Sequence, residues 1–379
     1  MKENWTYKKL GEVCGITMGQ SPDSDSVNSL DGIEFHQGKT CFGERLLGVS
    51  KFFASKPSKI AEPNSVLLCV RAPVGYPNIT DRKICIGRGL CALSVKKEIN
   101  VPFLYYSLLS RQQYFEKNAT GSTFKAISSK IVSNTLIPIP PMEEQERIVA
   151  ELDLLQSVID KKKAQLDEYD KLAQSIFYEM FGDPIDNPKK WEVKKLGKIT
   201  KSVGGGTPSK TVQQYWNGDV VWVSSKDMKT TYISDSQIHI TQEGVENSSA
   251  KLLPIGTILI VNRSGILKHT LPVAITTREV TINQDIKALV VNDEKVANIY
   301  LLFCIKAFSN YLLSKVKTVT VDSIEFAIFK NLPIPLPPLS LQQSFAEKIE
   351  AIEHQKELVK QSLNEVKTLF DSRMDYYFN

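Results

Sequence analysis

Two stretches of the chain carry apolar residues at alternating steps of three and four, the spacing of a coiled-coil seam. The seam positions of the first stretch include Leu152, Leu155, Ile159 and Leu166, and those of the second include Ile349, Ile352, Val359 and Leu363. Each stretch predicts a helix of about 38 residues, or roughly 57 Å, which is too long for one small domain to cover. Each helix could still pack on its own domain. Because they match in length and register, we expect them to pair with each other, antiparallel.

Outside these stretches the hydrophobic pattern is typical of strands. Short runs rich in β-branched residues are broken by Gly, Pro and Asn. Runs 65–70 and 257–261 are each followed by an arginine, Arg71 or Arg263, and runs 86–93 and 282–289 place Arg88 and Gln284 in a turn. Helical patterns follow near 101–117 and 297–316. The predicted class is α+β.

The same order of patterns occurs twice, which indicates a duplicated domain. Segment 5–13 (WTYKKLGEV) recurs 186 positions later as 191–199 (WEVKKLGKI), and segment 138–145 (PIPPMEEQ) recurs 197 positions later as 335–342 (PLPPLSLQ). The second copy has therefore gained loop residues without losing order. We predict a β-rich domain at 1–143, a helix at 144–182, a second β-rich domain at 183–338 and a second helix at 339–379.

Composition excludes several classes of protein. The hydrophobic and charged fractions, 42% and 23%, are those of a globular chain. No apolar run reaches membrane-spanning length, and the first residues lack the apolar core of a signal peptide. The six cysteines form no CxxC pair and the four histidines are scattered, so we expect reduced thiols, no metal site and a cytoplasmic location.

Charge is distributed unevenly. Residues 1–143 carry 18 basic and 12 acidic side chains, a net charge of +6, and residues 183–338 carry 19 and 14, a net charge of +5. The helical segments are acidic, with net −4 over 144–182 and −2 over 339–379. This asymmetry favours a polyanion as the partner of the two domains and a different partner for the helices.

Catalytic motifs are not recognisable. Segment 187–190 (NPKK) lacks the second proline and the aromatic residue of a DNA methyltransferase motif, and segment 204–208 (GGGTP) lacks the Lys-Ser/Thr of a P-loop, so we interpret it as a flexible turn. The chain is interpreted as non-catalytic, without a bound cofactor. Two alternatives stay open at this point: a methyltransferase or nuclease whose motifs have drifted, and a coiled-coil adaptor for protein partners.

The repeated WxxxKLG opening, the PIPPxxxQ junction, the heptad helix behind it and the FGDP link at 181–184 resemble the specificity (S) subunit of type I restriction-modification systems over essentially the whole chain. The resemblance implies two target recognition domains joined by two antiparallel helices. It implies that each domain reads one half of a bipartite double-stranded DNA target, while the helices set the spacing and dock methylation subunits, two of them, and restriction endonuclease subunits. S-adenosylmethionine is then expected on the methylation partner.

Two segments depart from the resemblance. The second junction (LSLQ, 339–342) lacks the acidic residue that usually precedes the glutamine. Loop 121–125 (GSTFK) aligns with 318–322 (TVTVD) of the second copy, which is less polar and carries no basic residue.

Polar and basic residues at loop positions, most of them matched between the copies, are the candidates for DNA contact. Arg, Lys, Gln and Asn read base edges, whereas Ser, Thr and Lys contact phosphates. The candidates of the first copy are Gln20, Ser21, Lys39, Arg71, Arg88, Ser122, Thr123 and Lys125, and those of the second are Thr207, Ser209, Lys226, Arg263 and Gln284. For each of them the alternative is a solvated loop residue. Phe35 and Trp222 are expected in the core.

Overall fold

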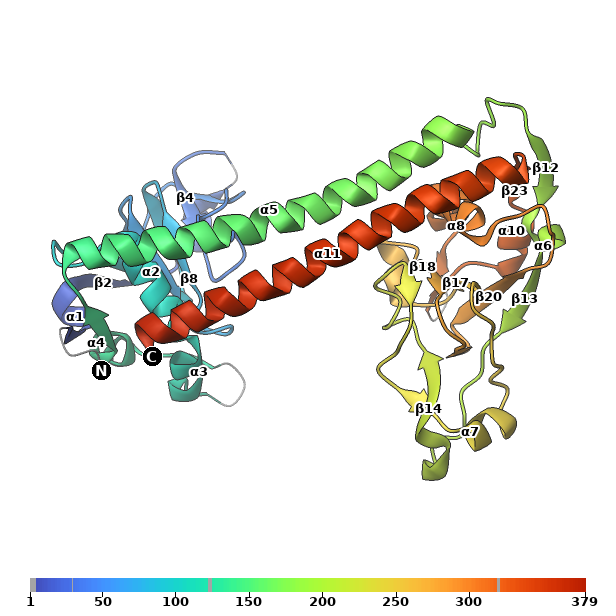
Figure 1. The fold of residues 1–379 in the computed structure, drawn as a ribbon. Coiled ribbons are helices and arrows are strands. Elements are labelled where there is room, and N and C mark those ends of the chain that lie inside the picture. Colours follow the sequence, from blue (N-terminus) through green and yellow to red (C-terminus); the bar gives the residue numbers. More distant parts are fainter. Residues whose placement is uncertain (1–4, 29, 122–124, 319–320) are drawn as a thin grey trace. The chain divides into compact units, whose positions relative to one another are not determined.

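The computed structural model describes residues 5–28, 30–121, 125–318 and 321–379. The chain forms two compact units, residues 1–164 with 360–379, and residues 165–359 (Figure 1). Both unit borders fall inside the long helices α5 (Met142–Phe181) and α11 (Leu339–Phe378). Each unit therefore contains one of the repeated domains, one end of α5 and one end of α11. The domain borders proposed from the sequence stay a prediction.

The first unit is built on two sheets. One has the strand order β2-β10-β7-β8 and the other β3-β5-β4-β9-β6. Its strands are β1 (Thr6–Lys9), β2 (Cys14–Met18), β3 (Val27–Asn28), β4 (Ile33–His36), β5 (Phe53–Ala54), β6 (Ile60–Ala61), β7 (Ser65–Cys69), β8 (Pro77–Thr80), β9 (Ile84–Ile86), β10 (Leu90–Val95) and β11 (Leu136–Ile139). Its short helices are α1 (Leu10–Val13), η1 (Ser24–Ser26), α2 (Val101–Ser110), α3 (Gln112–Asn118) and α4 (Ser129–Asn134).

The second unit repeats this plan with the orders β13-β20-β17-β18-β15 and β16-β14-β19. Its strands are β12 (Glu192–Lys195), β13 (Thr200–Gly204), β14 (Trp216–Val223), β15 (Tyr232–Ile233), β16 (His239–Ile240), β17 (Ile258–Val261), β18 (Val273–Thr276), β19 (Thr281–Ile282), β20 (Ile286–Val291), β21 (Lys317–Thr318), β22 (Asp322–Ser323) and β23 (Pro333–Leu336). Its short helices are α6 (Leu196–Ile199), η2 (Gln213–Tyr215), α7 (Gln242–Glu246), η3 (Gly265–Lys268), α8 (Asn298–Ala307), α9 (Ser309–Leu313) and α10 (Phe326–Lys330).

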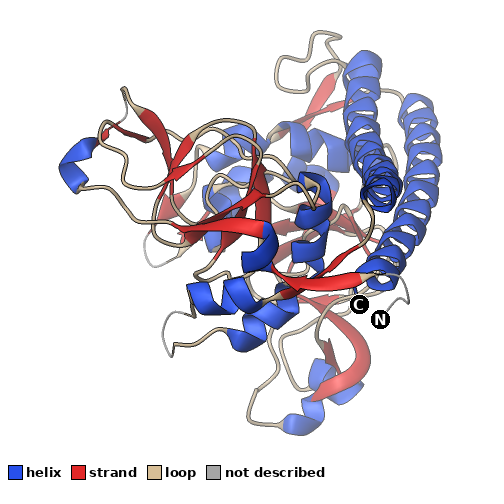
Figure 2. Cartoon of the chain, turned by 90° about the vertical axis from the view of Figure 1, so that its left-hand side faces the viewer, coloured by secondary structure: helices blue, strands red, loops and turns tan. Residues whose placement is uncertain are grey.

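Strands β7 and β17 hold the matching inner positions of the two units. Every residue of both strands is buried, and every one except Ser65 is apolar (SVLLC and ILIV), as expected of strands covered on both faces. In the first unit α2 covers β7 and β8, and in the second α8 packs on β18. Figure 2 shows the strands and helices of the chain by type. The predicted α+β class is confirmed.

The two repeated sequence motifs pair with each other inside each unit. β1 is antiparallel to β11, with Tyr7 opposite Pro138, and β12 is antiparallel to β23, with Val193 opposite Pro335. Both pairs are two-stranded, so each proline-bearing strand is an edge strand, the position in a sheet where a residue without an N–H is tolerated. The opening motif is thus held beside the residues that lead into the long helix.

A buried glutamine fastens the start of each long helix. Gln145 and Gln342 are both fully buried. In the first unit the Gln145 side chain accepts a hydrogen bond from the Asn100 N–H (2.9 Å) and donates to the carbonyls of Glu98 (2.9 Å) and Pro140 (2.9 Å). The Gln342 side chain accepts from the Ala297 N–H (2.8 Å) and donates to two carbonyls, those of Lys295 (2.8 Å) and Pro337 (2.8 Å).

Each long helix has 40 residues, and the two run antiparallel. In the first unit Glu151 of α5 forms an ion pair with Arg373 (2.8 Å) and accepts a hydrogen bond from Tyr377 (2.7 Å), both near the end of α11. In the second unit Lys356 of α11 donates to Asp170 of α5 (2.6 Å) and to Glu353 (2.9 Å). Lys356 is only 8% exposed.

The seam residues proposed from the heptads lie on the covered sides of the helices. Those that are buried are Leu152, Ile159, Ile349, Ile352, Val359 and Leu363, and those that are half-buried are Leu155 and Leu166. Which of them pair with one another stays a prediction.

Aromatic contacts hold each domain to its helices. In the first unit the rings of Tyr106 and Phe370 lie 6.2 Å apart and those of Phe103 and Phe378 lie 5.3 Å apart. In the second unit Phe181 contacts Tyr300 (4.7 Å) and Phe345 (5.3 Å). The first two pairs are tilted and the last two are edge-on, and rings at these separations add to the stabilisation from burial. The domains and helix ends therefore form one core within each unit.

The link after α5 ends that helix at Phe181. Gly182 adopts a positive φ of 77°, the conformation that favours glycine behind a helix. Lys189 folds back, and its amino group donates to the carbonyls of Met180 (2.7 Å) and Glu179 (3.0 Å). A cation at the carbonyl end of the helix also favours the helix dipole.

Candidate nucleic-acid interface

One edge of the first unit gathers five loops that are distant in the sequence. Five backbone hydrogen bonds, each from an N–H to a carbonyl oxygen, join them: Gln20 to Ile86 (3.1 Å), Gly87 to His36 (2.8 Å), Val70 to Gly89 (2.9 Å), Ala72 to Lys125 (3.0 Å) and Ile127 to Val70 (2.9 Å). The loops follow β2, β4 and β7, connect β9 to β10, and precede α4. They form a continuous loop edge, which we call the first loop edge.

The second unit has the same edge, made by the same bonds at matched positions. They run from N–H to carbonyl: Gly206 to Ile282 (2.9 Å), Asn283 to Val223 (2.9 Å), Asn262 to Asp285 (3.0 Å), Ser264 to Asp322 (2.9 Å) and Ile324 to Asn262 (2.9 Å). We call this the second loop edge. Because all five bonds are repeated, the two edges are the same construction and not a chance gathering of polar loops.

The first loop edge contains every described candidate of its copy. Gln20, Lys39, Arg71, Arg88 and Lys125 are exposed, and Ser21, which is half-buried, accepts a hydrogen bond from the Arg88 N–H (3.3 Å). The amino group of Lys39 lies 3.4 Å from the centre of the Tyr76 ring, a cation–π contact that steadies this lysine. The candidates Ser122 and Thr123 lie outside the described residues.

The second loop edge brings together Thr207, Lys226, Arg263 and Gln284. The Thr207 hydroxyl donates to the side-chain oxygen of Gln284 (2.5 Å). Arg263 donates from its Nε to Asp285 (2.8 Å). Whether these residues touch DNA stays a prediction.

Ser209 lies three residues beyond Gly206 in the same loop. Its hydroxyl lies 2.8 Å from that of Thr211, and its carbonyl accepts from the Trp216 indole (3.1 Å).

The two edges differ in charge. In the first, the candidate cations Lys39, Arg71, Arg88 and Lys125 have no carboxylate partner among the residues that the structure describes. In the second, Arg263 is paired with Asp285, and the position matched to Lys125 is the buried Asp322, which accepts from the Thr318 hydroxyl. The first edge is therefore more attractive to a polyanion than the second.

Asp285 and Asn283 belong to the site, and pattern analysis of the sequence missed them. Asn283 is buried, and its side-chain amide donates to Asp285 (3.1 Å). The one signal present was their place beside Gln284 in the matched turn. Asp285 was not a candidate because the candidates for DNA contact were polar and basic residues, and Asp285 is acidic.

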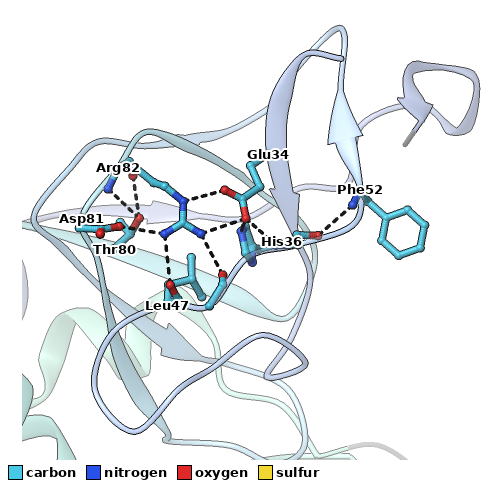
Figure 3. A network of polar contacts seen from close by, with 9 residues as sticks. Glu34, His36, Leu47, Phe52, Thr80, Asp81 and Arg82 are labelled. Carbon is cyan, nitrogen blue, oxygen red and sulfur yellow. Dashed lines mark hydrogen bonds and ion pairs between the residues drawn. The ribbon is translucent and has the colours of Figure 1, made fainter. Parts of the chain in front are cut away.

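An ion-pair network supports β4, the strand that leads to Lys39 (Figure 3). Arg82 donates from Nε to one oxygen of Glu34 (2.6 Å) and from a terminal nitrogen to the other (2.9 Å). The same guanidinium donates to the carbonyls of Leu47 (3.1 Å) and Gly48 (2.9 Å). A bidentate pair of this kind fixes orientation as well as adding energy. β4 is thereby held to two neighbouring loops.

The network also sets the protonation of its members. Burial opposes ionisation of Glu34, but hydrogen bonds from Arg82 and from the Ser50 N–H outweigh it and hold the pKa of Glu34 at about 2. Burial lowers the pKa of His36 against the opposing effect of Glu34. His36 therefore stays neutral near pH 7 and lies 3.0 Å from the Glu34 carboxylate.

Phe35 and Trp222, expected in the core, are buried in the structure, with 8% and 7% of their surface exposed. The Trp222 indole donates to the carbonyl of Gly206 (2.8 Å), so that it holds the loop that carries Thr207.

Two features are absent from the described residues. No group of three or more His, Cys, Asp or Glu side chains is placed to hold a metal ion within the described ranges. Nor does any helix in that part of the chain combine the length and apolar character needed to cross a membrane.

Comparison with known families defines the class of protein. Residues 2–168 and 188–368 each match the type I restriction modification DNA specificity domain. The two matches cover most of the chain. The chain belongs to this family, and it carries the domain twice.

Individual relatives agree with this assignment. The chain is 36% identical over 178 residues to a putative type I restriction enzyme MjaX specificity subunit of Methanocaldococcus jannaschii, a match covering 46% of this chain and 42% of the relative. It is 32% identical over 252 residues to the EcoR124I/EcoR124II specificity subunit of Escherichia coli, covering 65% and 62%. These matches span less than two thirds of either relative's length.

Solved structures support the fold over the whole chain. A type I restriction-modification S subunit from M. genitalium superimposes with a TM-score of 0.59 at 15% identity and covers 100% of this chain and 98% of its own. A chain from work on complex assembly and conformational transition of the type I R-M system has a TM-score of 0.62 at 21% identity, with coverage of 100% and 98%.

Proposed function

We propose that this chain is the DNA sequence-specificity subunit of a type I restriction-modification complex. Each loop edge reads one half of a bipartite double-stranded target. The observation that carries the proposal is the repetition of the same five backbone hydrogen bonds, which gather polar and basic loops at one edge of each unit. Side chains of these types contact base edges and phosphates. A single edge is too small to read a long site, which favours two short half-sites with an unread gap.

We infer that the long helices separate the half-sites and dock the partner subunits. Their exposed residues are mostly polar or charged. The helical segments are also net acidic, which disfavours DNA and favours protein. The partners proposed are methylation subunits, two of them, and restriction endonuclease subunits. S-adenosylmethionine is expected on the methylation subunit, and the chain is proposed to contribute recognition without catalysis.

Methylome sequencing tests the proposal. Cells that express this chain with its methylation subunits should carry one bipartite modified sequence, which disappears when the chain is omitted. Replacing residues 183–338 by those of a relative should change one half of the modified sequence, and the reciprocal replacement of residues 1–143 should change the other half. A change in both halves, or in neither, would contradict a modular reading.

A separate measurement addresses the enzymatic alternative. The purified chain alone should transfer no methyl group from S-adenosylmethionine to DNA, whereas the complex should do so. Turnover by the isolated chain at the rate of the complex would establish it as the catalyst instead.

A further inference from the structure

We propose that Asp285 is a positioning residue that holds Arg263 for end-on recognition of one guanine in the half-site of the second unit. The inference rests on the proposed function. To that function it adds one base contact, made by Arg263 and positioned by Asp285.

The geometry of the pair is defined from three sides. The Arg263 Nε donates to Oδ1 of Asp285 (2.8 Å), and its backbone N–H donates to the Asp285 carbonyl (3.3 Å). The other carboxylate oxygen, Oδ2, accepts from the side-chain amide of Asn283 (3.1 Å), while the Asp285 N–H donates to the Asn283 side-chain oxygen (3.1 Å). Asn283 is itself only 6% exposed. The carboxylate is therefore held by a buried side chain before it meets the arginine.

This arrangement leaves the other end of the guanidinium available. Among the described residues, neither terminal nitrogen of Arg263 has a hydrogen-bond partner, and 51% of the side chain is exposed. The two terminal N–H groups match the O6 and N7 acceptors of guanine in the major groove. Because the side chain is already held at Nε, less conformational entropy is lost when it binds.

The carboxylate also weakens the alternative contact. A phosphate approaching Arg263 meets the charge of Asp285, whose side chain is 25% exposed, and like charges repel. Guanine presents neutral acceptors and is not repelled. The pair therefore favours base recognition over general attraction to the DNA backbone.

The first loop edge supplies the contrast. The position matched to Asp285 is Gly89, and a Cβ built there would lie 3.8 Å from the Cβ of Arg71. Gly89 has a φ of 101° and no carboxylate. Arg71 matches Arg263, but it has no carboxylate at the position that matches Asp285. The orienting carboxylate is therefore a feature of the second loop edge alone among these two matched pairs.

The test measures base preference in the assembled complex with its methylation subunits. Binding is measured on a panel of duplexes in which each base pair of the target is changed in turn. Arg263→Ala should abolish the preference at a single G·C pair of the second half-site, a loss of tenfold or more. Asp285→Ala should reduce the preference at that same pair by a comparable factor, while affinity for unrelated DNA stays the same or rises because a negative charge has been removed. Asp285→Asn keeps an oxygen acceptor and should restore part of the preference.

Asp293→Ala is the matched control. Asp293 follows the other end of β20 and pairs with Lys194 (2.9 Å), so this variant removes an ion-paired carboxylate of the same unit away from the loop edge. It should leave every base preference unchanged. Thermal unfolding of each variant shows whether the fold is retained.

Each outcome decides the matter. The inference is overturned if Asp285→Ala leaves the preference at every base pair intact, or if Arg263→Ala weakens binding to all sequences alike; in both cases the proposed function survives. A wild-type complex without any bipartite target would overturn the proposed function and this inference together.

Discussion

Gln145 and Gln342 lie 197 positions apart, and their side-chain amides form hydrogen bonds with three equivalent backbone groups, each in its own copy of the repeat. Each amide joins the start of a long helix to the carbonyl five residues before it and to the loop that precedes α2 or α8. A buried amide with its oxygen and nitrogen both engaged defines one orientation of the helix relative to its domain. The glutamine of the repeated junction therefore has a structural function, and the acidic residue that precedes it in only one copy is not needed for these bonds.

Replacing either glutamine by alanine should destabilise its unit. Gln145→Ala leaves the Asn100 N–H and the carbonyls of Glu98 and Pro140 without this partner inside the protein. We expect a loss of about 2–4 kcal/mol in the free energy of unfolding, since each unmet buried group costs about 1–3 kcal/mol and water re-enters in part. Gln342→Ala should act alike. Urea denaturation measures the loss, and Gln343→Ala, at an exposed position of α11, is the control and should stay within about 0.5 kcal/mol. Equal effects at 342 and 343 would contradict this role.

The Glu34 network should make stability depend on acid. The pKa of Glu34 is about 2 in the folded chain against an ordinary 4.5, so its stabilising effect is complete above pH 4.5 and is lost as the pH falls towards 2. At pH 7, Glu34→Gln should lower the free energy of unfolding by about 1.5–3 kcal/mol, the range for hydrogen bonds to charged groups. The difference from wild type should shrink below pH 4.5.

Denaturation at a series of pH values measures this dependence. Glu62→Gln, which removes an exposed carboxylate paired with Lys83 (3.3 Å), is the control and should have little effect at any pH. A Glu34→Gln deficit that is constant from pH 7 to pH 3 would show that the loss comes from packing and not from the charge.

Arg71 should act on the DNA backbone. It is exposed, and among the described residues no carboxylate orients its side chain. Arg71→Ala should therefore weaken binding to all sequences alike and reduce the slope of log K against log salt by about one. Lys130→Ala is the control, because Lys130 is exposed on α4, a helix that packs against α1 and β2, and is not one of the loop residues proposed to contact DNA. Loss of preference at one base pair would instead assign Arg71 to base reading.

Helix length should set the gap between the half-sites. Leu166 lies one turn before Asp170, and Val359 lies about one turn after Lys356, the ion-pair partner of Asp170. Because the helices are antiparallel, Leu166 and Val359 lie at the same height along the pair. Inserting one heptad after each preserves the seam and lengthens the pair by roughly 10 Å. The unread gap in the methylated sequence should grow by about three base pairs, at ~3.4 Å each, with both half-sites unchanged.

A four-residue insertion at both places is the comparison for the heptad, since it breaks the seam and should abolish methylation. A heptad variant that folds and methylates with the original gap would show that the helices do not determine spacing.

The repeat, the strands and the long helices were predictable because each leaves a periodic or duplicated mark on the sequence. Apolar steps of three and four predicted helices that the structure extends to 40 residues each. Matching the two copies predicted that Lys125 and Asp322 occupy the same place, and both carbonyls accept the corresponding backbone bond.

The side-chain partners could not be predicted in this way. Arg263 and Asp285 are 22 positions apart, and Glu34 and Arg82 are 48 apart. No period links such residues, because the turn geometry that brings them together depends on tertiary packing. The role of Gln145 was hidden for the same reason: its partners are backbone groups, which every residue has.

The division of the chain into units has a consequence for folding during translation. The first unit includes residues 360–379 as well as residues 1–164, and Phe370 and Phe378 pack against Tyr106 and Phe103. The second unit is one uninterrupted segment, residues 165–359. The unit whose translation begins first is therefore completed last. Until residues 360–379 have been synthesised, the aromatic surface of α2 lacks the side chains that cover it in the folded chain.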